Sequence, residues 1–383
     1  MKLLLFNYYS YIRNDLLEEF ARRGFQCQVM DHKFKDKNHD DEFLFSFKNL
    51  LKEGGFDFVF SVNYYPLLAQ ACCDLKMKYI SWSYDCPLDV RNIEETLGYS
   101  TNYVFLYDNI QYQKYREQGF NNVYHLPLAV NTKRLDKLVV KSKHLRDYGD
   151  DISFIGKLYK YVYPEITEFL PEYLQGYLDG ICESQLNVYG CYFLEQMITE
   201  DLMRDLNLIW QKKAGFHMIK EELSYACAAQ ITYNERTRLL EMLSQLPGGN
   251  RVSLYSEDKL GIKGVQEKGA VNYHQQMPYV FKTSKINLNM SLKCIPSGIP
   301  LRVIDIMGCG GFLLTNFQQE LLDYFEPGVD LAVYTSLEEA LDLADYYLKN
   351  DGERRKIAEN GYKKVKRDFT YADRLDKILE ISL

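Results

Sequence analysis

The stretch that most constrains the fold is residues 284–316, where an apolar run, a helical pattern and a second apolar run follow one another. The first run covers residues 285–289, the helical pattern residues 301–308, and the second run residues 312–315. Prolines and a glycine separate the first run from the helix. This order predicts a strand-helix-strand unit of a parallel sheet. Its loop and helix start then lie at the carboxyl end of a strand, where open α/β sheets bind ligands.

Two charged residues, Arg302 and Asp305, interrupt the apolar helix of this unit. Pro300 suits a first helical position, so free backbone N–H groups there favour an anion, and Arg302 adds a fork of donors for phosphate. Asp305 can accept two hydrogen bonds from the hydroxyls of a ribose, and Gly310 and Gly311 let a backbone approach a bulky ligand. Together they predict a nucleotide-diphosphate pocket. The alternative is a solvated i,i+3 ion pair followed by a glycine helix stop.

The first half of the chain alternates short apolar runs with helical patterns. The predicted strands are residues 2–7, 26–31, 57–62, 78–83, 102–107 and 122–126. The predicted helices between them are residues 12–21, 43–51, 66–75 and 110–118. Nearly continuous apolar strands are covered on both faces, which predicts a parallel sheet in a Rossmann-like domain. The chain lacks a glycine-rich GxGxxG motif after the first strand, which argues against a classical dinucleotide site there.

Two residues near strand ends of this first half are candidate general bases. Asp85 follows the fourth strand in an aromatic neighbourhood, which can desolvate a carboxylate and raise its pKa; its alternative role is an Asx turn or helix N-cap before Pro87. His125 lies in the last strand, where a lone histidine is more often a hydrogen-bonded core residue than a base.

The second half begins after a charged, weakly periodic stretch at residues 136–150, which we interpret as a linker. A strand at residues 152–155 then leads into Gly156 and Lys157, which form either a second phosphate cradle or a surface turn. Residues 160–250 are mainly helical, and we find no chemical motif in them.

Strands and helices alternate again beyond this helical stretch. The further predicted strands are residues 251–255, 269–273, 285–289, 312–315 and 330–334. A capping box from Ser336 to Glu339 begins the next helix, and helices at residues 351–365 and 370–379 follow. The pattern predicts a second α/β domain.

Length, charge and cysteine use limit the class of protein. A chain of 383 residues is long enough for about two domains. Its net charge of -7 argues against broad binding of nucleic acid. No apolar stretch is long enough to cross a membrane, and no secretory leader opens the sequence. The nine cysteines show no zinc-type spacing, which predicts free thiols in a reducing cytoplasm.

Several segments resemble a known family. The segment at residues 125–131 looks like the turn that closes the first domain of the GT-B class of nucleotide-sugar glycosyltransferases, and residues 154–158 are similar to the start of their donor domain. The run RVIDIMGCGGFLLT at residues 302–315 closely resembles the signature of the bacterial spore-maturation-protein-like glycosyltransferases, also called glycosyltransferase group 1-like. Residues 324–328 and 354–361 continue the match.

The resemblance implies a GT-B fold with two Rossmann-like domains facing a central cleft. The first, residues 1–135, is expected on the acceptor side. The second, residues 151–368, is expected to bind the donor and to carry a helical insertion at about residues 160–250. A C-terminal helix at residues 369–383 is expected to pack back on the first domain.

The resemblance also assigns roles to single residues. Asp305 takes the position of the glutamate that contacts the donor ribose, and Gly156, Lys157 and Arg302 lie near the diphosphate. Many retaining relatives carry a second glutamate eight residues earlier, which contacts the sugar; here that position is Ser297. The donor-binding residues expected in addition are Tyr255, Asn289, Gly310 and Gly311.

The expected function is transfer of a sugar from a nucleotide sugar, most simply a UDP-sugar, to a hydroxyl of a protein or glycan in bacterial glycan or glycoprotein synthesis. The chain has no Asp-x-Asp motif, so Lys157 and Arg302 rather than a metal are expected to stabilise the departing diphosphate, with Asp85 as base if the reaction inverts. The alternatives are a nucleotide-sugar epimerase of the same fold and a catalytically silent carbohydrate-binding or assembly protein.

Overall fold

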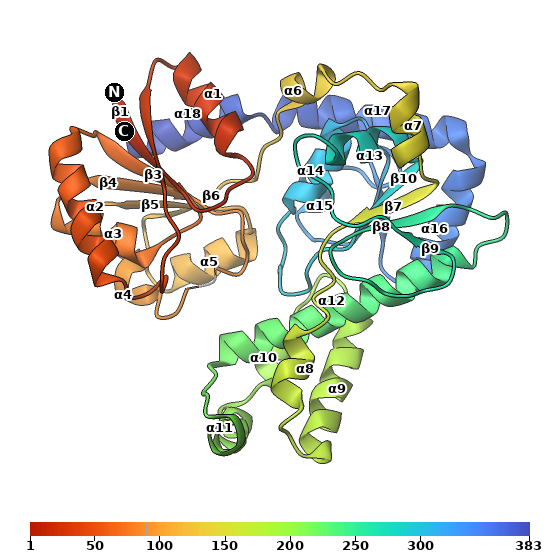
Figure 1. Cartoon of the computed structure of the whole chain (residues 1–383), viewed down its shortest axis with the longest axis horizontal. Helices are drawn as coiled ribbons and strands as arrows, with labels where there is room; N and C mark the ends of the chain where they lie inside the picture. Colours follow the sequence, from red (N-terminus) through yellow and green to blue (C-terminus); the bar gives the residue numbers. More distant parts are fainter. Residues whose placement is uncertain (89) are drawn as a thin grey trace. The chain divides into compact units, whose positions relative to one another are not determined.

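In the computed structural model, which describes residues 1–88 and 90–383, the chain forms two compact units (Figure 1). The first consists of three segments, Met1–Asn131, Ser297–Ile304 and Lys366–Leu383. The second consists of Thr132–Pro296 and Asp305–Val365. Each unit contains one six-stranded parallel sheet, which confirms the predicted fold class of two Rossmann-like α/β units.

The sheet of the first unit has the strand order β2-β1-β3-β4-β5-β6. Its strands are β1 (Lys2–Asn7), β2 (Gln26–Asp31), β3 (Phe58–Val62), β4 (Lys78–Trp82), β5 (Asn102–Leu106) and β6 (Val123–His125). All five neighbouring pairs are parallel. Every residue of β3 is buried, whereas the edge strand β2 is largely exposed or half-buried, because helices cover both faces of the central strands.

The helices of the first unit pack an aromatic core against this sheet. They are α1 (Arg13–Arg22), α2 (Asp41–Gly54), α3 (Pro66–Asp74), α4 (Glu94–Leu97), α5 (Asn109–Glu117) and the C-terminal α18 (Tyr371–Ser382). Asp40 caps α2 by accepting a hydrogen bond from the Phe43 N–H, and Pro66 opens α3, so local sequence explains both starts. Phe6, Phe43 and Phe47 are buried in the core between α2 and the sheet.

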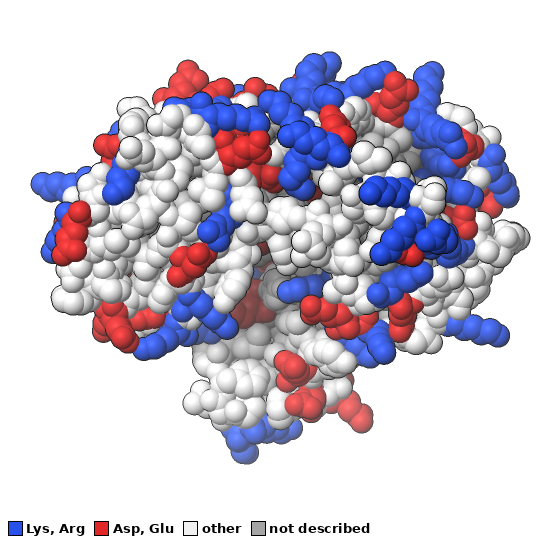
Figure 2. All heavy atoms as spheres, turned by 45° about the horizontal axis from the view of Figure 1, so that its top comes forward, with Lys and Arg blue, Asp and Glu red and all other residues white. Residues whose placement is uncertain are grey.

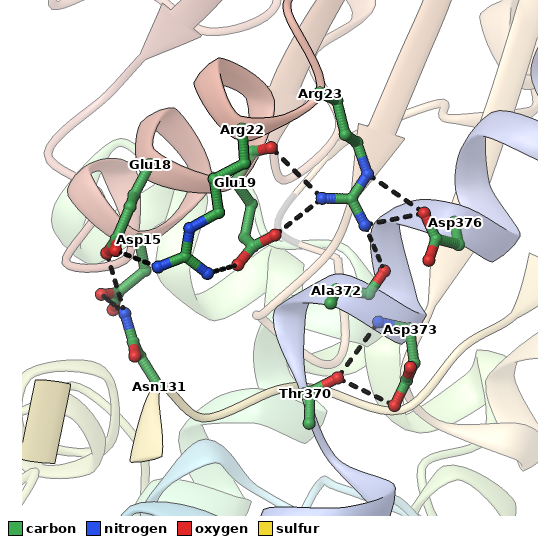
Figure 3. A network of polar contacts seen from close by, with 10 residues as sticks. All are labelled: Asp15, Glu18, Glu19, Arg22, Arg23, Asn131, Thr370, Ala372, Asp373 and Asp376. Carbon is green, nitrogen blue, oxygen red and sulfur yellow. Dashed lines mark hydrogen bonds and ion pairs between the residues drawn. The ribbon is translucent and has the colours of Figure 1, made fainter. Parts of the chain in front are cut away.

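Helix α18 packs on α1, as Figure 3 shows. The guanidinium of Arg23, the residue that directly follows α1, donates to the Asp376 carboxylate at 2.7 Å and to the Ala372 carbonyl at 2.8 Å. The Asp376 side chain is 67% exposed, so this ion pair contributes little, about 0–1 kcal/mol. Leu375 and Ile378 on the same helix are fully buried, at about 1.5–3 kcal/mol each. Apolar burial therefore holds α18 in place, and the ionic network orients it.

The sheet of the second unit has the strand order β12-β11-β10-β7-β8-β9. Its strands are β7 (Ile152–Ile155), β8 (Val252–Tyr255), β9 (Val265–Glu267), β10 (Ile286–Asn289), β11 (Leu313–Asn316) and β12 (Ala332–Tyr334). The order reverses between β7 and β10, where the chain crosses from one side of the sheet to the other. This topological switch point is the place where doubly wound sheets bind ligands.

The strand predicted at residues 269–273 is wrong. The edge strand β9 lies earlier, and residues 268–276 form a loop. The Asn272 side chain accepts hydrogen bonds from the N–H groups of His274 and Gln275 at 3.0 and 2.9 Å. Such an Asx turn satisfies the backbone locally and competes with a sheet ladder.

The helices of the second unit fall into a group around the sheet and a helical insertion. Around the sheet are α6 (Thr132–Asp136), α7 (Ser142–Tyr148), α13 (Met277–Thr283), α14 (Leu301–Gly308), α15 (Leu321–Tyr324), α16 (Leu337–Lys349) and α17 (Asp351–Asp368), of which α14 and α17 each run from one unit into the other. The insertion contains α8 (Val162–Thr167), α9 (Glu172–Leu186), α10 (Leu194–Met197), α11 (Glu200–Ala214) and the start of α12 (Lys220–Ser244). The stretch expected to be a linker thus carries α7.

The insertion has a hydrophobic core of its own, which includes Leu178, Leu206 and Trp210. Helix α12 continues out of this core, and its later residues Leu239 and Leu243 belong to the core of the sheet. Figure 1 shows the shorter helices gathered around one half of α12, with the sheet at its other half. One continuous helix therefore connects the insertion to the sheet.

On the face in Figure 2, acidic and basic side chains are interspersed. All nine cysteines are free thiols. Within residues 1–88 and 90–383, no helix is long and apolar enough to cross a membrane. In the same part of the chain, no three histidine, cysteine, aspartate or glutamate side chains cluster as a metal site requires.

Candidate functional site

The switch point of the second sheet brings together the loops that follow β7 and β10. Gly156 and Lys157 follow β7 directly, and the Gly156 N–H donates to the Tyr255 carbonyl at 3.2 Å. The Lys157 side chain is exposed. The structure therefore places an exposed lysine at the carboxyl end of a central strand, which fits both the predicted phosphate cradle and the alternative surface turn.

Arg236 of α12 connects the loops that follow β7 and β10 through hydrogen bonds. Its guanidinium donates to the backbone carbonyls of Lys157, after β7, and of Met290, after β10. It lies over the rings of Phe154 and Tyr159 at 5.1 and 5.3 Å and is only 7% exposed. Burial lowers its pKa from the ordinary value. The planar fork of an arginine suits this task, because two carbonyls on different loops accept from one rigid group.

Sequence reasoning missed Arg236, since residues 160–250 contained no recognisable motif. A signal was present in the sequence: the adjacent charged residues Glu235 and Arg236 interrupt the helix α12, whose other buried residues are mostly apolar. Both side chains of this pair are buried. Buried charges are rare unless they are paired or functional, so such an interruption indicates a polar site.

Asp305 lies on α14 with its side chain only 4% exposed. The Tyr273 hydroxyl donates to its Oδ1 at 3.0 Å. The solvated surface ion pair considered as an alternative requires an exposed carboxylate, and Asp305 is buried. Arg302, one turn earlier on the same helix, is half-buried. The helix thus presents a guanidinium near its start and a buried carboxylate in its middle.

The two glycines after α14 have roles within the protein. Gly310 has a φ of +74°, and its N–H donates to the Met307 carbonyl, while the Gly311 N–H donates to the Ile306 carbonyl. This is a Schellman C-cap. A Cβ at Gly311 would lie 2.6 Å from the Phe281 carbonyl oxygen. The helix-stop alternative therefore explains both residues without a ligand.

The side chains of Tyr255 and Asn289 also have partners inside the second unit. The Tyr255 hydroxyl donates to Asp150 at 2.6 Å, and burial together with this hydrogen bond raises the Tyr255 pKa above its ordinary value. The Asn289 amide donates to the Thr315 hydroxyl at 2.9 Å and to the Ser291 hydroxyl at 3.1 Å. Asn289 thereby joins the carboxyl ends of β10 and β11.

In the first unit, Asn63 holds the loop that carries Asp85. Asn63 adopts a φ of +66° at the end of β3, and its Oδ1 accepts from the Tyr84 N–H at 2.7 Å and the Asp85 N–H at 3.1 Å. Its Nδ2 donates to the Asp85 carboxylate at 2.6 Å. The Asp85 side chain is exposed rather than enclosed by aromatic rings. His125 is half-buried, with Nε2 3.3 Å from the Tyr107 carbonyl oxygen.

Ser297 and Gly298, which precede α14, are anchored to Asp108. The Asp108 Oδ2 accepts from the N–H groups of Ser297 and Gly298 at 2.8 and 2.7 Å, while its Oδ1 caps α5 by accepting from Gln111. The Ser297 hydroxyl accepts from the Ile110 N–H at 3.2 Å. Ser297, which the resemblance aligns with a sugar-contacting glutamate, is therefore part of a backbone anchor here.

Comparisons with known proteins agree with this architecture. Residues 236–380 match the model of the family described as "Glycosyl transferase-like", a segment that includes Arg236, Asn289, Arg302 and Asp305. No curated protein matches the chain in sequence.

Solved structures resemble the chain over its whole length. HepE of Anabaena, solved with UDP-glucose, is 10% identical with a TM-score of 0.60, and the match covers 100% of this chain and 99% of HepE. Sucrose-phosphate synthase from Thermosynechococcus elongatus is 10% identical with a TM-score of 0.58 and coverages of 100% and 98%. WaaG, a glycosyltransferase of lipopolysaccharide biosynthesis, is 10% identical with a TM-score of 0.55 and full coverage of both chains.

Proposed function

We propose that the chain is a glycosyltransferase that transfers a sugar from a UDP-sugar to a hydroxyl group of an acceptor. Its GT-B fold and the match of residues 236–380 to the glycosyl transferase-like family support this. The observation that carries the proposal is the buried Asp305 carboxylate on the helix that follows the switch-point strand β10. HepE, which has the same fold, has been solved with UDP and with UDP-glucose, and this supports uridine as the nucleoside.

The donor is held through its ribose and its diphosphate. In this proposal the Asp305 carboxylate accepts hydrogen bonds from the two ribose hydroxyls, and the Tyr273 hydroxyl, 3.0 Å from Oδ1, keeps the carboxylate in one orientation. The start of α14 and Arg302 face the diphosphate, since free N–H groups and a guanidinium both favour phosphate oxygens. Lys157 adds an ammonium group from the loop that Arg236 fixes.

The reaction breaks the bond between the anomeric carbon and the diphosphate oxygen and forms a bond from that carbon to the acceptor oxygen. UDP leaves with the electron pair, and Lys157, Arg302 and backbone N–H groups stabilise the negative charge that develops on it. We propose that these groups suffice without a metal ion. The acceptor, a protein or glycan hydroxyl, loses its proton to Asp85 if the reaction inverts.

The free thiols of the chain support a cytoplasmic location, because persistent disulfides belong to oxidising compartments. We propose the cytoplasm of a bacterium as the place of the reaction.

Calorimetric titration with UDP tests the donor assignment. We expect Asp305→Ala to weaken UDP binding at least tenfold, which corresponds to about 1.4 kcal/mol, because two hydrogen bonds to a charged group are lost. Asp323→Ala on α15, a single carboxylate removed elsewhere in the second unit, is the control and should leave the affinity unchanged. Equal affinity of the wild type and Asp305→Ala for UDP contradicts the ribose assignment. Sugar transfer itself is tested by measuring the release of UDP from a UDP-sugar with and without an added glycan. Transfer requires that UDP release depends on the glycan.

A further inference from the structure

The stretch at residues 133–147, which contains most of α6, the loop after it and nearly all of α7, is strongly basic. It holds six lysines and arginines against two aspartates, a net charge of +4, whereas the whole chain carries -7. We call it the basic segment. In Figure 1 its ribbon lies along the top of the second unit. Its exposed cations are Lys133, Lys137, Lys141, Lys143 and Arg146.

Neighbouring carboxylates do not neutralise these five cations. Within residues 1–88 and 90–383, none of them lies within 4.0 Å of a carboxylate oxygen. Other exposed lysines of the second unit are paired, such as Lys349 with Asp345 and Lys363 with Glu359. A local excess of unpaired positive charge on an otherwise acidic protein raises the electrostatic potential there and attracts anionic partners.

The other faces of α6 and α7 hold the basic segment on the second unit. Leu135 of α6 is only 3% exposed, and the neighbouring Asp136 carboxylate accepts a hydrogen bond from the Tyr362 hydroxyl of α17 at 2.7 Å. On α7, the His144 ring lies against the Tyr279 ring of α13, with 3.8 Å between the ring centres. The outward surface is therefore preformed, and a partner does not have to order it.

Aliphatic side chains lie exposed among the cations. Val139 is 67% exposed, Val140 37% and Leu145 54%. The two valines stand in the loop between α6 and α7, with Lys137 before them and Lys141 after them. Single exposed apolar residues are common, but here three occur within a short basic stretch. Apolar side chains flanked by lysines are typical of segments that enter the headgroup region of a membrane.

A lipid surface fits this segment better than a nucleic acid does. Both offer phosphate groups to the lysines. Nucleic-acid surfaces add aromatic side chains that stack on bases, or polar ones that read base edges. The uncharged side chains most exposed here are aliphatic, and these gain free energy by leaving water for the acyl region of a bilayer.

We propose that the basic segment docks the chain on the anionic surface of a membrane. Val139 and Val140 enter the boundary between headgroups and acyl chains, and Lys137, Lys141 and Lys143 reach the lipid phosphates with their long side chains. The contact is peripheral and does not depend on a membrane-spanning helix. It goes beyond the proposed sugar transfer and does not rest on it.

Co-sedimentation of the full chain with lipid vesicles tests the proposal. One set of vesicles consists of phosphatidylcholine, which has no net charge, and the other contains phosphatidylglycerol as well. Lys141→Gln combined with Lys143→Gln removes two charges from the segment. Val139→Ser combined with Val140→Ser removes the exposed apolar side chains of its loop. All four positions are exposed, so both variants should fold, and equal unfolding temperatures check this.

The matched control is Lys263→Gln combined with Lys268→Gln, which removes the same charge from two exposed lysines near β9. We expect the wild type and the control to bind the anionic vesicles equally and to stay in solution with phosphatidylcholine. The lysine variant should bind the anionic vesicles at least about tenfold more weakly, because two cations near the surface are lost. The valine variant should bind at least about threefold more weakly, because less apolar area leaves water.

Several results would overturn the proposal. Equal binding of the wild type to both kinds of vesicle, or binding to neither, is one. A lysine variant that binds as tightly as the control is another. If duplex DNA binds more tightly than the anionic vesicles and the valine variant behaves like the wild type, the partner is a nucleic acid and the lipid assignment is wrong. UDP binding is measured separately, so each of these results leaves the proposed sugar transfer intact.

Discussion

Replacement of Arg236 by lysine should destabilise the second unit by roughly 2–4 kcal/mol. The guanidinium donates to the carbonyls of Lys157 and Met290, and one ammonium group cannot span both. One hydrogen bond from a charged group contributes about 1.5–3 kcal/mol. The lost contact with the rings of Phe154 and Tyr159 adds about 0.5–1 kcal/mol. A lysine still supplies a positive charge beside Glu235, so the variant should fold.

The two tryptophans allow this loss to be measured in the second unit alone. Trp82 lies in β4 of the first unit, and Trp210 lies in the insertion core of the second. In a Trp82→Phe background, the fluorescence of Trp210 reports unfolding of the second unit. For a unit of this size, 2–4 kcal/mol corresponds to a Tm lower by roughly 4–16 °C. The Kd for UDP should rise about tenfold, because the loop that carries Lys157 loses its support.

The chain offers a matched control two residues further along α12. Arg238 forms a bidentate ion pair with Glu183 at 2.6 and 2.8 Å, but both side chains are about half exposed. Exposed pairs contribute 0–1 kcal/mol, so Arg238→Lys should change stability by less than 0.5 kcal/mol. If Arg236→Lys lowers the free energy of unfolding by no more than Arg238→Lys does, the hydrogen bonds from Arg236 do not hold the two loops together.

Three further predictions concern packing and pH. Gly311→Ala should cost about 1–3 kcal/mol by urea unfolding, because the new methyl group meets the Phe281 carbonyl; a cost under 0.5 kcal/mol would show that β11 can shift. Ile378→Ala should cost about 2–4 kcal/mol and Asp376→Ala less than 1 kcal/mol, and the reverse order would mean that charge holds α18. Burial acts to raise the Asp151 pKa, but a backbone N–H and a lysine ammonium outweigh it and hold the pKa below its ordinary value. The Asp151 carboxylate therefore stabilises the fold above about pH 4, and this stabilisation is lost as the pH falls below that value. In a plot of the free energy of unfolding against pH, Asp151→Asn should reduce the decrease on the acid side.

Local patterns were enough to predict the first sheet and every strand of the second sheet except β9. The first two strands have the bounds that the apolar runs indicated, and α14 spans the predicted residues 301–308. β1 contains a continuous apolar run, and α14 has helical spacing and ends at a glycine, so one interpretation fits each of them. The burial of Asp305 was not decided by the sequence, because a carboxylate in an apolar helix can face a polar site or form a solvated pair with Arg302, three residues earlier.

The contacts that fix the loops could not be predicted in the same way. Asp108 accepts from the N–H groups of Ser297 and Gly298, which lie 189 and 190 positions later in the sequence. Nothing local distinguishes Asp108 from an ordinary helix cap, a role that it also fills for α5. Long-range pairs of this kind depend on the tertiary arrangement and leave no periodic trace in a single sequence.

The position of Glu235 and Arg236 within α12 explains how the helical insertion is connected to the strand loops of the second unit. Earlier residues of α12, such as Leu223, pack in the insertion core, and later ones, such as Leu243, pack in the sheet core. The two buried charges lie between these cores, where one side chain holds the strand loops and the other faces Lys293. A rotation of the insertion would turn α12 and leave these charges without partners, at a cost of several kcal/mol. The insertion is thus tied in orientation to the loops at the switch point.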